Sequence, residues 1–390
     1  MDRSVANRLS PTTAFLTDPA AQSLCKALER AGHQALFVGG CVRNAVLDAP
    51  ASDVDIATDA LPQQVMRLAA NGGYRAVPTG IDHGTVTVIV NDTPFEVTTF
   101  RKDVATDGRR AVIAFSRNVA EDARRRDFTM NALYADRHGD ILDPLGGLPD
   151  AQARRVRFIE DAATRIREDY LRILRFFRFH AYYSDPDIGW DADALAGIAE
   201  TVEGLDTLSA ERVGAEMLKL LAAPDPIQAV SVMARTGVLA RILPGADTTL
   251  LGPVVHVQAL AHLPPDAITR LAALGGEDVG MRLRLSRQDQ KLRDSIRDLS
   301  GSALPLAALG QEGGVAAATG AHVLRSAVQN QMVSPGDLAK IGAGAQAKFP
   351  LSAKDLPHLT GPDLGARLKA LRGQWLASDL TMDKDALLQA

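Results

Sequence analysis

The 390-residue sequence has only two cysteines, Cys25 and Cys41. Two thiols cannot form a disulfide framework, and no Cys/His cluster has the spacing of a zinc site, so we expect both to be buried and reduced. No apolar run reaches about 18 residues, which argues against a membrane-spanning helix. The N-terminus also lacks the charged-then-apolar pattern of a secretory signal. We therefore expect a cytoplasmic protein with no membrane partner.

An excess of positive charge is absent too, because 43 Lys and Arg face 47 Asp and Glu, for a net charge of −4. A protein that binds nucleic acid by electrostatics alone has the opposite balance, so any RNA binding must rest on local basic patches. The hydrophobic content of 46% is ample for buried cores. The length predicts roughly two to four domains.

A phosphate-binding loop of the common kinds is missing after the glycine pair Gly39-Gly40. No Gly-Lys-Ser/Thr follows it, and no third glycine has the dinucleotide spacing. The pair nevertheless separates a short apolar run, 35–38, from a segment with helical spacing, 42–47, which predicts a strand, a tight turn and a helix. Backbone amides at such a turn can approach phosphate oxygens, because glycine has no side chain in the way.

Two aspartates, Asp53 and Asp55, follow this helix. If 53–57 is a strand, residues i and i+2 project to one face, and both carboxylates point at the same spot. Paired carboxylates suit Mg²⁺, which prefers carboxylates plus substrate phosphates to a cage made only of protein. The alternative is a pair of solvated acids at the edge of a loop.

The next segment predicts a small mixed α/β unit. Thr58 is a candidate N-cap for a helix through residue 69. Strands are expected at 74–79, 85–90 and 95–100, the last two joined by a turn at 91–94. Glu96 would lie on this hairpin, either as a further acid of the metal site or as a surface strand residue. The polar segment 101–114 has little periodicity and predicts a mobile loop, or a merely solvated one.

Arg125 and Arg126 precede Asp127 and an apolar segment, 128–134, that we interpret as a helix. Arginines at a helix start oppose its dipole, so a nearby anion would compensate them. A surface cluster of ion pairs is the other interpretation.

Residues 168–179 predict a helix that is apolar nearly all round and therefore buried. It also carries Asp169, Arg172, Arg175 and Arg178 at a spacing of three. Arginines on a buried helix are costly unless each meets an acid, a base edge or a phosphate. One aspartate cannot serve all three, so the pattern indicates an anionic ligand. Alternatively, the arginines extend to solvent from a half-buried helix.

Asp169 and Arg172, one helical turn apart, offer an acceptor beside a donor. Cytosine and adenine both present an amino donor beside a ring acceptor on their pairing edges, whereas U and G present the reverse. The pair therefore satisfies C or A, and U or G would leave buried groups unpaired.

Beyond about residue 150 the strand patterns stop and helical patterns dominate, with Ser209 as an N-cap of a helix through 221. Six basic residues gather in 281–299 against three aspartates. They are a candidate contact for nucleic-acid phosphates or a solvated helix face.

The ordered segments resemble the polymerase β type nucleotidyltransferases. More narrowly, they resemble the class II tRNA nucleotidyltransferases, or CCA-adding enzymes, and the related bacterial poly(A) polymerases. The segments are GGCVRN at 39–44, DVDIAT at 53–58, FEVTTFRKD at 95–103, DGRR at 107–110, RRDFTMNAL at 125–133, DPLGG at 143–147 and EDYLRILRFFRF at 168–179. Asn44 departs from the usual Asp of the family, and Asp48 stands where Gly is common.

The resemblance implies an α+β fold, with a nucleotidyltransferase head at 1–150, a helical neck at 151–225 and an all-α body and tail at 226–390 that bind tRNA. It implies template-independent addition of CCA to the 3′ end of tRNA from CTP and ATP, with release of pyrophosphate. The alternatives are a poly(A) polymerase and a non-catalytic RNA-binding protein. The flexible loop that such enzymes have near 101–114 accompanies addition of the terminal A. The resemblance does not indicate an oligomeric state.

The implied site has two Mg²⁺ ions on Asp53 and Asp55, with Glu96 as a third catalytic acid. The implied nucleotide-binding residues are Gly39, Gly40, Arg43, Arg125, Arg126, Asp127, Asp169, Arg172, Arg175 and Arg178. The glycine turn, Arg43 and Arg126 would hold the triphosphate, and Asp127 would orient the arginines beside it or the sugar. Arg175 and Arg178 would add nucleotide or phosphate contacts.

Overall fold

A computed structural model describes residues 7–106 and 111–390 of the chain. The chain divides into two compact units, Met1–Leu205 and Asp206–Ala390, which we describe separately. The expected three-part division into head, neck and body remains a prediction.

The first unit contains a mixed seven-stranded sheet. Its strand order is β3-β4-β5-β2-β1-β8-β9. The strands are β1 (Ala35–Val38), β2 (Asp55–Thr58), β3 (Arg75–Gly80), β4 (Thr85–Val90), β5 (Thr93–Thr99), β8 (Tyr134–Ala135) and β9 (Ile141–Leu142). Strands β2 and β5 pair in parallel, whereas the other neighbours are antiparallel. The α+β class expected from the sequence is confirmed.

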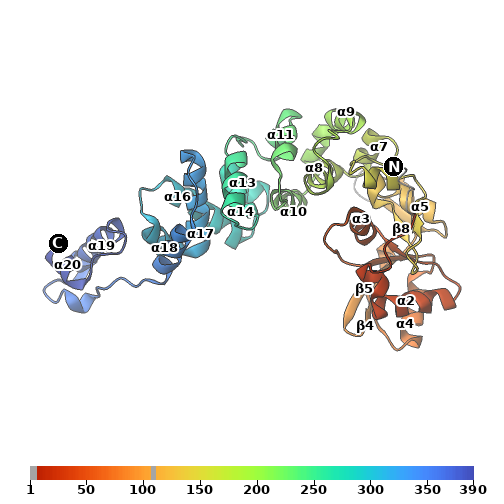
Figure 1. Cartoon of the computed structure of the whole chain (residues 1–390), viewed down its shortest axis with the longest axis horizontal. Helices are drawn as coiled ribbons and strands as arrows, with labels where there is room; N and C mark the ends of the chain where they lie inside the picture. The colour runs from red at the N-terminus through yellow and green to blue at the C-terminus, as the bar shows by residue number, and fades with distance from the viewer. Residues whose placement is uncertain (1–6, 107–110) are drawn as a thin grey trace. The chain divides into compact units, whose positions relative to one another are not determined.

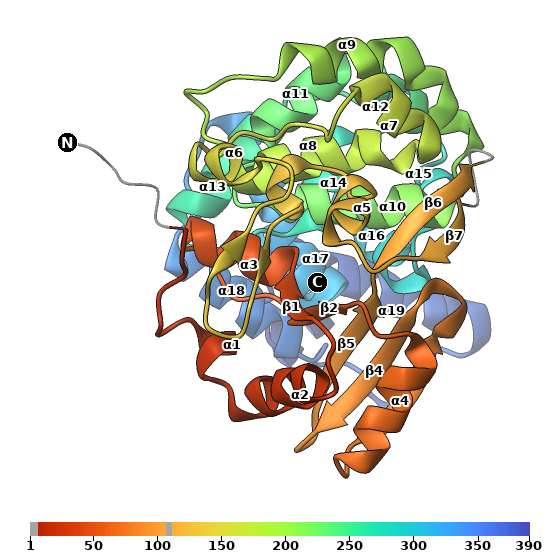
Figure 2. The ribbon, with the colours of Figure 1, turned by 90° about the vertical axis from the view of Figure 1, so that its right-hand side faces the viewer.

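Strands β4 and β5 form the predicted hairpin. In β4, Val86, Val88 and Val90 are buried while the alternate residues, Thr85, Thr87 and Ile89, are only partly buried, which is the alternation of a strand with one core face. The turn residues Asn91 and Asp92 have φ values of 49° and 64°, the left-handed conformation that a tight hairpin turn requires. Helices α2 (Pro19–Arg30) and α4 (Pro62–Asn71) lie together beside these strands (Figures 1 and 2).

Three expected elements differ in the structure. Helix α4 begins at Pro62, because Thr58 is still part of strand β2. The segment 128–134 holds one 3-10 turn, Thr129–Asn131, and then enters strand β8. The expected loop at 101–114 is instead a two-stranded hairpin of β6 (Arg101–Thr106) and β7 (Ala111–Phe115). The DGRR segment at 107–110 lies outside the described residues.

The expected helix at 168–179 is two helices. Helix α7 (Ala162–Glu168) ends where Asp169 takes an extended conformation, with φ −157° and ψ 103°, and α8 (Leu171–Tyr183) starts two residues later. The Asp169 carboxylate accepts a hydrogen bond from the Leu171 amide at 3.1 Å, so it caps the start of α8. The remaining helices of this unit are α1 (Ala14–Thr17), α3 (Gly40–Leu47), α5 (Val119–Arg124), α6 (Leu148–Gln152) and α9 (Ala192–Thr201).

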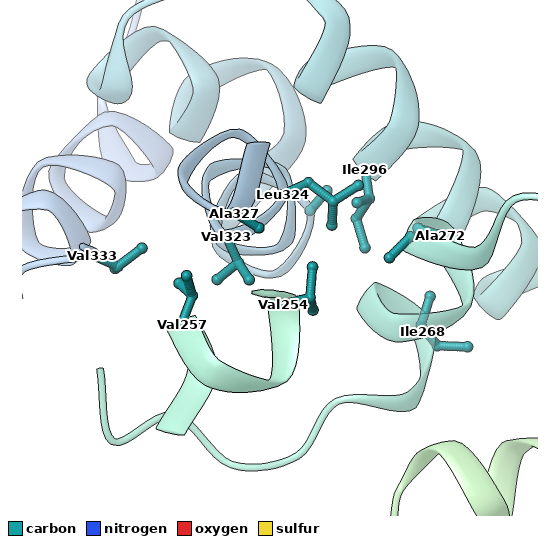
Figure 3. Close-up of a cluster of buried hydrophobic side chains, with 11 residues drawn as sticks. Val254, Val257, Ile268, Ala272, Ile296, Val323, Leu324, Ala327 and Val333 are labelled. Atoms are coloured by element: carbon teal, nitrogen blue, oxygen red, sulfur yellow. The ribbon is translucent and has the colours of Figure 1, made fainter. Parts of the chain in front are cut away.

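The second unit is built from helices, as expected. They are α10 (Ala210–Leu221), α11 (Ile227–Arg235), α12 (Val238–Ile242), α13 (Leu251–Leu260), α14 (Ala267–Leu274), α15 (Val279–Arg282), α16 (Arg287–Gly301), α17 (Leu306–Gln329), α18 (Pro335–Gln346), α19 (Gly361–Ala377) and α20 (Lys384–Gln389). Val254, Ile268, Ile296 and Val323 point toward one another in its core, so α13, α14, α16 and α17 share one apolar cluster (Figure 3). Among the helices in the described ranges, none is long and apolar enough to cross a membrane.

The basic segment 281–299 is divided between α15 and α16, and several of its arginines have protein partners. Arg297 donates to the carbonyl of Ala272 at 3.0 Å, and Arg293 donates to Asp294 at 3.0 Å. Arg284 lies 3.4 Å from a carboxylate oxygen of Glu211. A tRNA contact here remains a prediction.

Candidate active site

The Gly39-Gly40 turn lies against the start of strand β2. Strand β1 pairs with β2 so that Val38 is opposite Asp55, and the turn follows Val38 directly. Gly39 has φ 70° and ψ −119°, a conformation that residues with a side chain rarely adopt. A Cβ atom at this position would lie 3.1 Å from Nη1 of Arg126. The turn therefore brings glycine backbone, with no side chain over it, close to both a carboxylate and a guanidinium.

Four carboxylates border one pocket beside this turn, those of Asp18, Asp53, Asp55 and Glu96. The parallel pairing of β2 with β5 places Asp55 opposite Glu96, and Asp53 is two residues before Asp55. Asp53 and Glu96 are exposed, and Asp55 is half-buried. The pocket has a volume of about 700 Å³ and is lined by Asp18, Ser52, Asp53, Val54, Asp55, Thr87, Thr93, Pro94, Phe95 and Glu96. The structure thus places all three predicted catalytic acids along one cavity.

The mutual repulsion of these carboxylates favours a bound cation. Burial, together with the charges of Glu96 and Asp53, raises the pKa of Asp55 to about 6 against the opposing effect of Arg126. Grouped carboxylates repel one another and are relieved by a bound positive ion. Within the described ranges, no three His, Cys, Asp or Glu side chains are grouped closely enough to hold a metal ion by themselves. The donor set suits Mg²⁺, which keeps waters and takes phosphate oxygens as its other ligands.

Arg126 is held beside Asp55 by a tyrosine and an aspartate. Its Nε donates to the Tyr134 hydroxyl at 3.2 Å, and its Nη2 donates to Asp122 Oδ2 at the same distance. The Tyr134 hydroxyl in turn donates to Asp122 at 2.7 Å. The Arg126 side chain remains 26% exposed, while Asp122 is buried. This arrangement fixes a guanidinium at the glycine turn, where it can meet an anion.

Asp127 is buried and joins the head to helix α8. It accepts hydrogen bonds from Asn131 Nδ2 at 2.8 Å and from Arg175 Nε at 2.8 Å. Burial alone would raise the pKa of Asp127, but the charge of Arg175 and these hydrogen bonds outweigh it and lower the pKa. Asp127 thus holds Arg175 of α8, and the expectation that it orients the arginines beside it or the sugar stays a prediction.

The arginines of α8 already have partners in the protein. Arg172 donates to Glu168 at 2.5 Å and to the carbonyls of Arg165 and Arg125 at 2.6 and 3.2 Å. The Arg178 guanidinium lies 4.8 Å from the centre of the Phe179 ring. Glu168 and Asp127 thus accept hydrogen bonds from two of these arginines, and an anionic ligand for the helix remains a prediction.

Arg43 does not line the turn surface. Its side chain is buried, with a residue exposure of 5%, among Asn44, Asn131 and Tyr183. The remaining candidates are half-buried near the start of α8: Asp169 caps this helix, and the Arg125 carbonyl accepts a hydrogen bond from Arg172.

The sequence interpretation missed four residues that organise the site: Asp122, Tyr134, Glu168 and Tyr183. Two of them could have been predicted from the spacing of charged residues in the sequence. Asp122 and Glu168 each precede an arginine by four residues, the spacing at which oppositely charged side chains meet on a helix. Tyr134 and Tyr183 reach their partners only through the tertiary fold.

A mixed sheet that presents strand-borne carboxylates beside a Gly-Gly turn, followed by helices, defines the class: an RNA nucleotidyltransferase of the polymerase β type. Two family models match, "Poly A polymerase head domain" over residues 35–157 and "Probable RNA and SrmB-binding site of polymerase A" over residues 191–250. The mitochondrial CCA tRNA nucleotidyltransferase 1 of Mus musculus is 31% identical over 408 residues, covering 97% of this chain and 91% of its own length. The chain belongs to the CCA tRNA nucleotidyltransferase family.

Other relatives agree with this membership. The CCA-adding enzyme of Geobacillus thermodenitrificans is 41% identical over 227 residues, covering 58% of this chain and 54% of its own length. The crystal structure of the Bacillus stearothermophilus CCA-adding enzyme in complex with CTP superposes with a TM-score of 0.75 at 28% identity, covering 96% of this chain and 98% of the other. The Thermotoga maritima CCA-adding enzyme complexed with tRNA_CCA has the same fold, with a TM-score of 0.68 at 18% identity and coverage of 98% and 97%.

Proposed function

We propose that this chain adds C, C and A to the 3′ end of tRNA from CTP and ATP, releasing pyrophosphate, at the pocket bordered by Asp53, Asp55 and Glu96. The observation that carries the proposal is the register of β2 and β5, which sets Asp55 opposite Glu96 beside the glycine turn. Relatives that match nearly the whole chain are named for CCA addition, and a related structure contains CTP.

The metal ligands in this proposal are Asp53 and Asp55. Mg²⁺ bound there would lower the pKa of the primer 3′ hydroxyl and would neutralise charge on the leaving pyrophosphate. Glu96 lies opposite Asp55 on the neighbouring strand and adds negative charge to the same pocket. Nucleotidyl transfer by positioning and charge neutralisation requires no covalent protein nucleophile.

The triphosphate is assigned to the glycine turn and Arg126. The backbone at Gly39 and Gly40 can approach phosphate oxygens without steric hindrance. Asp122 and Tyr134 fix the direction of the Arg126 guanidinium, so it meets the phosphate with little loss of side-chain freedom.

Base choice is assigned to Asp169 and Arg172. Glu168 and two backbone carbonyls hold Arg172, which fixes the direction in which its remaining N–H groups donate. An acceptor beside a donor fits the pairing edge of cytosine or adenine, whereas uracil or guanine would leave buried polar groups unpaired. Protein side chains thus take the place of a nucleic-acid template.

A poly(A) polymerase is the second candidate, because the family model that matches the head is named for that activity. A non-catalytic RNA-binding role is disfavoured by the paired acids. The decisive experiment incubates the protein and Mg²⁺ with tRNA transcripts that end before CCA, with CTP and ATP supplied separately and together. Growth by three residues followed by a stop supports CCA addition. Long A tails on varied RNAs would indicate a poly(A) polymerase, and no extension would indicate a binding protein.

The cytoplasmic location expected from the N-terminal sequence stays a prediction, since the relatives include mitochondrial and bacterial enzymes.

A further inference from the structure

Helices α7 and α8 meet at a joint of two residues, Asp169 and Tyr170. Asp169 is extended there, with φ −157° and ψ 103°, and its carboxylate accepts from the Leu171 amide at 3.1 Å. The Arg172 amide donates to the Asp169 carbonyl at 3.0 Å. The direction of the Asp169 carboxylate relative to Arg172 therefore depends on how this joint is held.

The Tyr170 ring is seated against the bare backbone of Gly204. A Cβ atom on Gly204 would overlap the Cδ1, Cε1 and Cζ atoms of the ring, whereas non-bonded carbons rest about 3.5–4.0 Å apart. Gly204 lies in the 3-10 helix Val202–Thr207, where φ is negative and the backbone does not require glycine. Glycine at this position therefore serves to make room for the tyrosine ring.

The segment that carries Gly204 is fixed to α7. It follows α9 directly, and α9 lies against α7 (Figures 1 and 2). A Cβ atom on Gly197 of α9 would lie 2.9 Å from both the Cβ of Ala162 and the amide nitrogen of Ala163, so the two helices are in close contact. Leu205, next to Gly204, is buried. The Tyr170 ring thus meets a surface that is packed against the helix preceding the joint.

We propose that Tyr170 and Gly204 are positioning residues that fix the direction of the Asp169 carboxylate. This inference rests on the proposed function, in which Asp169 and Arg172 select the base. An acceptor and a donor discriminate between C and U only while both meet the base edge in the correct alignment. Displacing the Tyr170 ring tilts the joint and moves Asp169 relative to Arg172. Loss of the contact therefore lowers the discrimination between C and U, and not only the overall rate.

The test compares Gly204→Ala with the wild-type protein. The added methyl group forces the Tyr170 ring to move and leaves Asp169 and Arg172 in place in the sequence. The measurement is kcat/KM for single addition of CTP and of UTP to a tRNA transcript ending before CCA. We expect the ratio of the two values to fall about tenfold, which corresponds to about 1.4 kcal/mol of differential transition-state binding. The ratio does not depend on the fraction of active protein, so loss of folded enzyme alone would not move it.

Gly72→Ala is the matched control, because it crowds another tyrosine of the same unit. A Cβ atom on Gly72 would lie 2.9 Å from Cε2 of Tyr74, and the φ of Gly72 is −80°, which alanine can adopt. Neither residue lines the pocket that contains Asp53 and Asp55. The C-over-U ratio of this variant should equal that of the wild type, even if its melting temperature is lower.

Tyr170→Ala tests the other side of the contact. It removes the ring without adding an atom at Gly204, so it should also lower the ratio, and it keeps the inference testable if Gly204→Ala folds poorly. Adding Gly204→Ala to Tyr170→Ala should cause no further fall, because no ring is left to displace. Such non-additivity is the mark of two side chains that act through one contact.

Each outcome tests either the proposed function or the positioning role. If the wild-type protein adds no C, the proposed function is overturned and this inference with it. If the wild type is active while Gly204→Ala and Tyr170→Ala retain its C-over-U ratio, the positioning role is overturned and the proposed function stands. The positioning role is also overturned if Gly204→Ala lowers the ratio equally with and without the Tyr170 ring.

Discussion

Neutralising Glu168 tests how the start of α8 is held together. Its two carboxylate oxygens serve two buried arginines, Arg165 at 2.7 Å and Arg172 at 2.5 Å. The side chains of Arg165 and Arg172 are 6% and 13% exposed, and that of Glu168 is 21% exposed. In Glu168→Gln the shape is kept, but both guanidinium groups remain buried next to a neutral amide.

The magnitude follows from that burial. Removing one partner of a buried ion pair costs roughly 3–5 kcal/mol, because the other charge is left uncompensated. Backbone carbonyls still accept from both arginines, and Glu168 itself is partly solvated, so we expect about 3 kcal/mol. For a unit of this size, that loss lowers the melting temperature by roughly 6–12 °C.

Thermal unfolding, followed by circular dichroism, measures the effect. Glu160→Gln is the control, because Glu160 forms an exposed pair with Arg124 at 3.3 Å, with side-chain exposures of 61% and 55%. Exposed pairs contribute about 0–1 kcal/mol, so this variant should melt close to the wild type. Equal shifts in the two variants would refute the reasoning that burial makes Glu168 important.

UTP incorporation should also rise in Glu168→Gln, since Arg172 loses one of the groups that direct it.

Four further predictions follow. Asp53→Ala should abolish nucleotide incorporation while leaving folding and tRNA binding largely intact, as gel extension and filter binding would show; unchanged turnover would remove the metal assignment. Asp169→Ala should incorporate UTP or GTP as well as CTP and ATP. If the variant still incorporates only C and A, other residues select the base. Burial lowers the pKa of His180 to about 4 from an ordinary 6.5, so the unfolded state binds the proton first. The contribution of neutral His180 to folding stability is complete above pH 6.5 and declines as the pH falls toward 4. His180→Gln should therefore flatten the curve of melting temperature against pH in this range. Burial raises the pKa of Cys25 to about 12 and of Cys41 to about 11, so neither thiol should react with iodoacetamide at pH 8 in the folded protein, and both should react in denaturant.

The parts of the site that could be predicted from sequence depend on local geometry. The glycine turn follows from an apolar run that ends in Gly39-Gly40, and the hairpin follows from alternation in β4 and the turn at Asn91 and Asp92. Two aspartates separated by one residue share a face wherever the chain is extended. These features need only neighbours within a few residues, so no knowledge of the tertiary structure was required.

Other predictions failed where a hydrogen bond or strand pairing that the periodicity does not indicate decided the structure. The segment 168–179 has helical periodicity throughout, yet it breaks at Asp169, which caps α8 with its side chain. The sequence of α8 itself offers too few acids for its arginines. In the fold, however, Asp127, which lies 48 residues before Arg175 in the chain, accepts a hydrogen bond from it. The polar residues at 101–114 predicted a loop, but β6 and β7 pair there as a hairpin, which their composition did not indicate.

The sequence by itself therefore determined the fold class, the family and the candidate acids, because spacing along the chain is enough to recognise a strand, a turn and an ordered set of segments. The tertiary structure alone decided which groups meet. Parallel pairing of β2 with β5 set Asp55 opposite Glu96, and packing buried Arg43 where it donates to Tyr183 of α8. The physical reason is that sheet register and side-chain packing are set by residues far apart in the chain, and local periodicity carries no information about those distances.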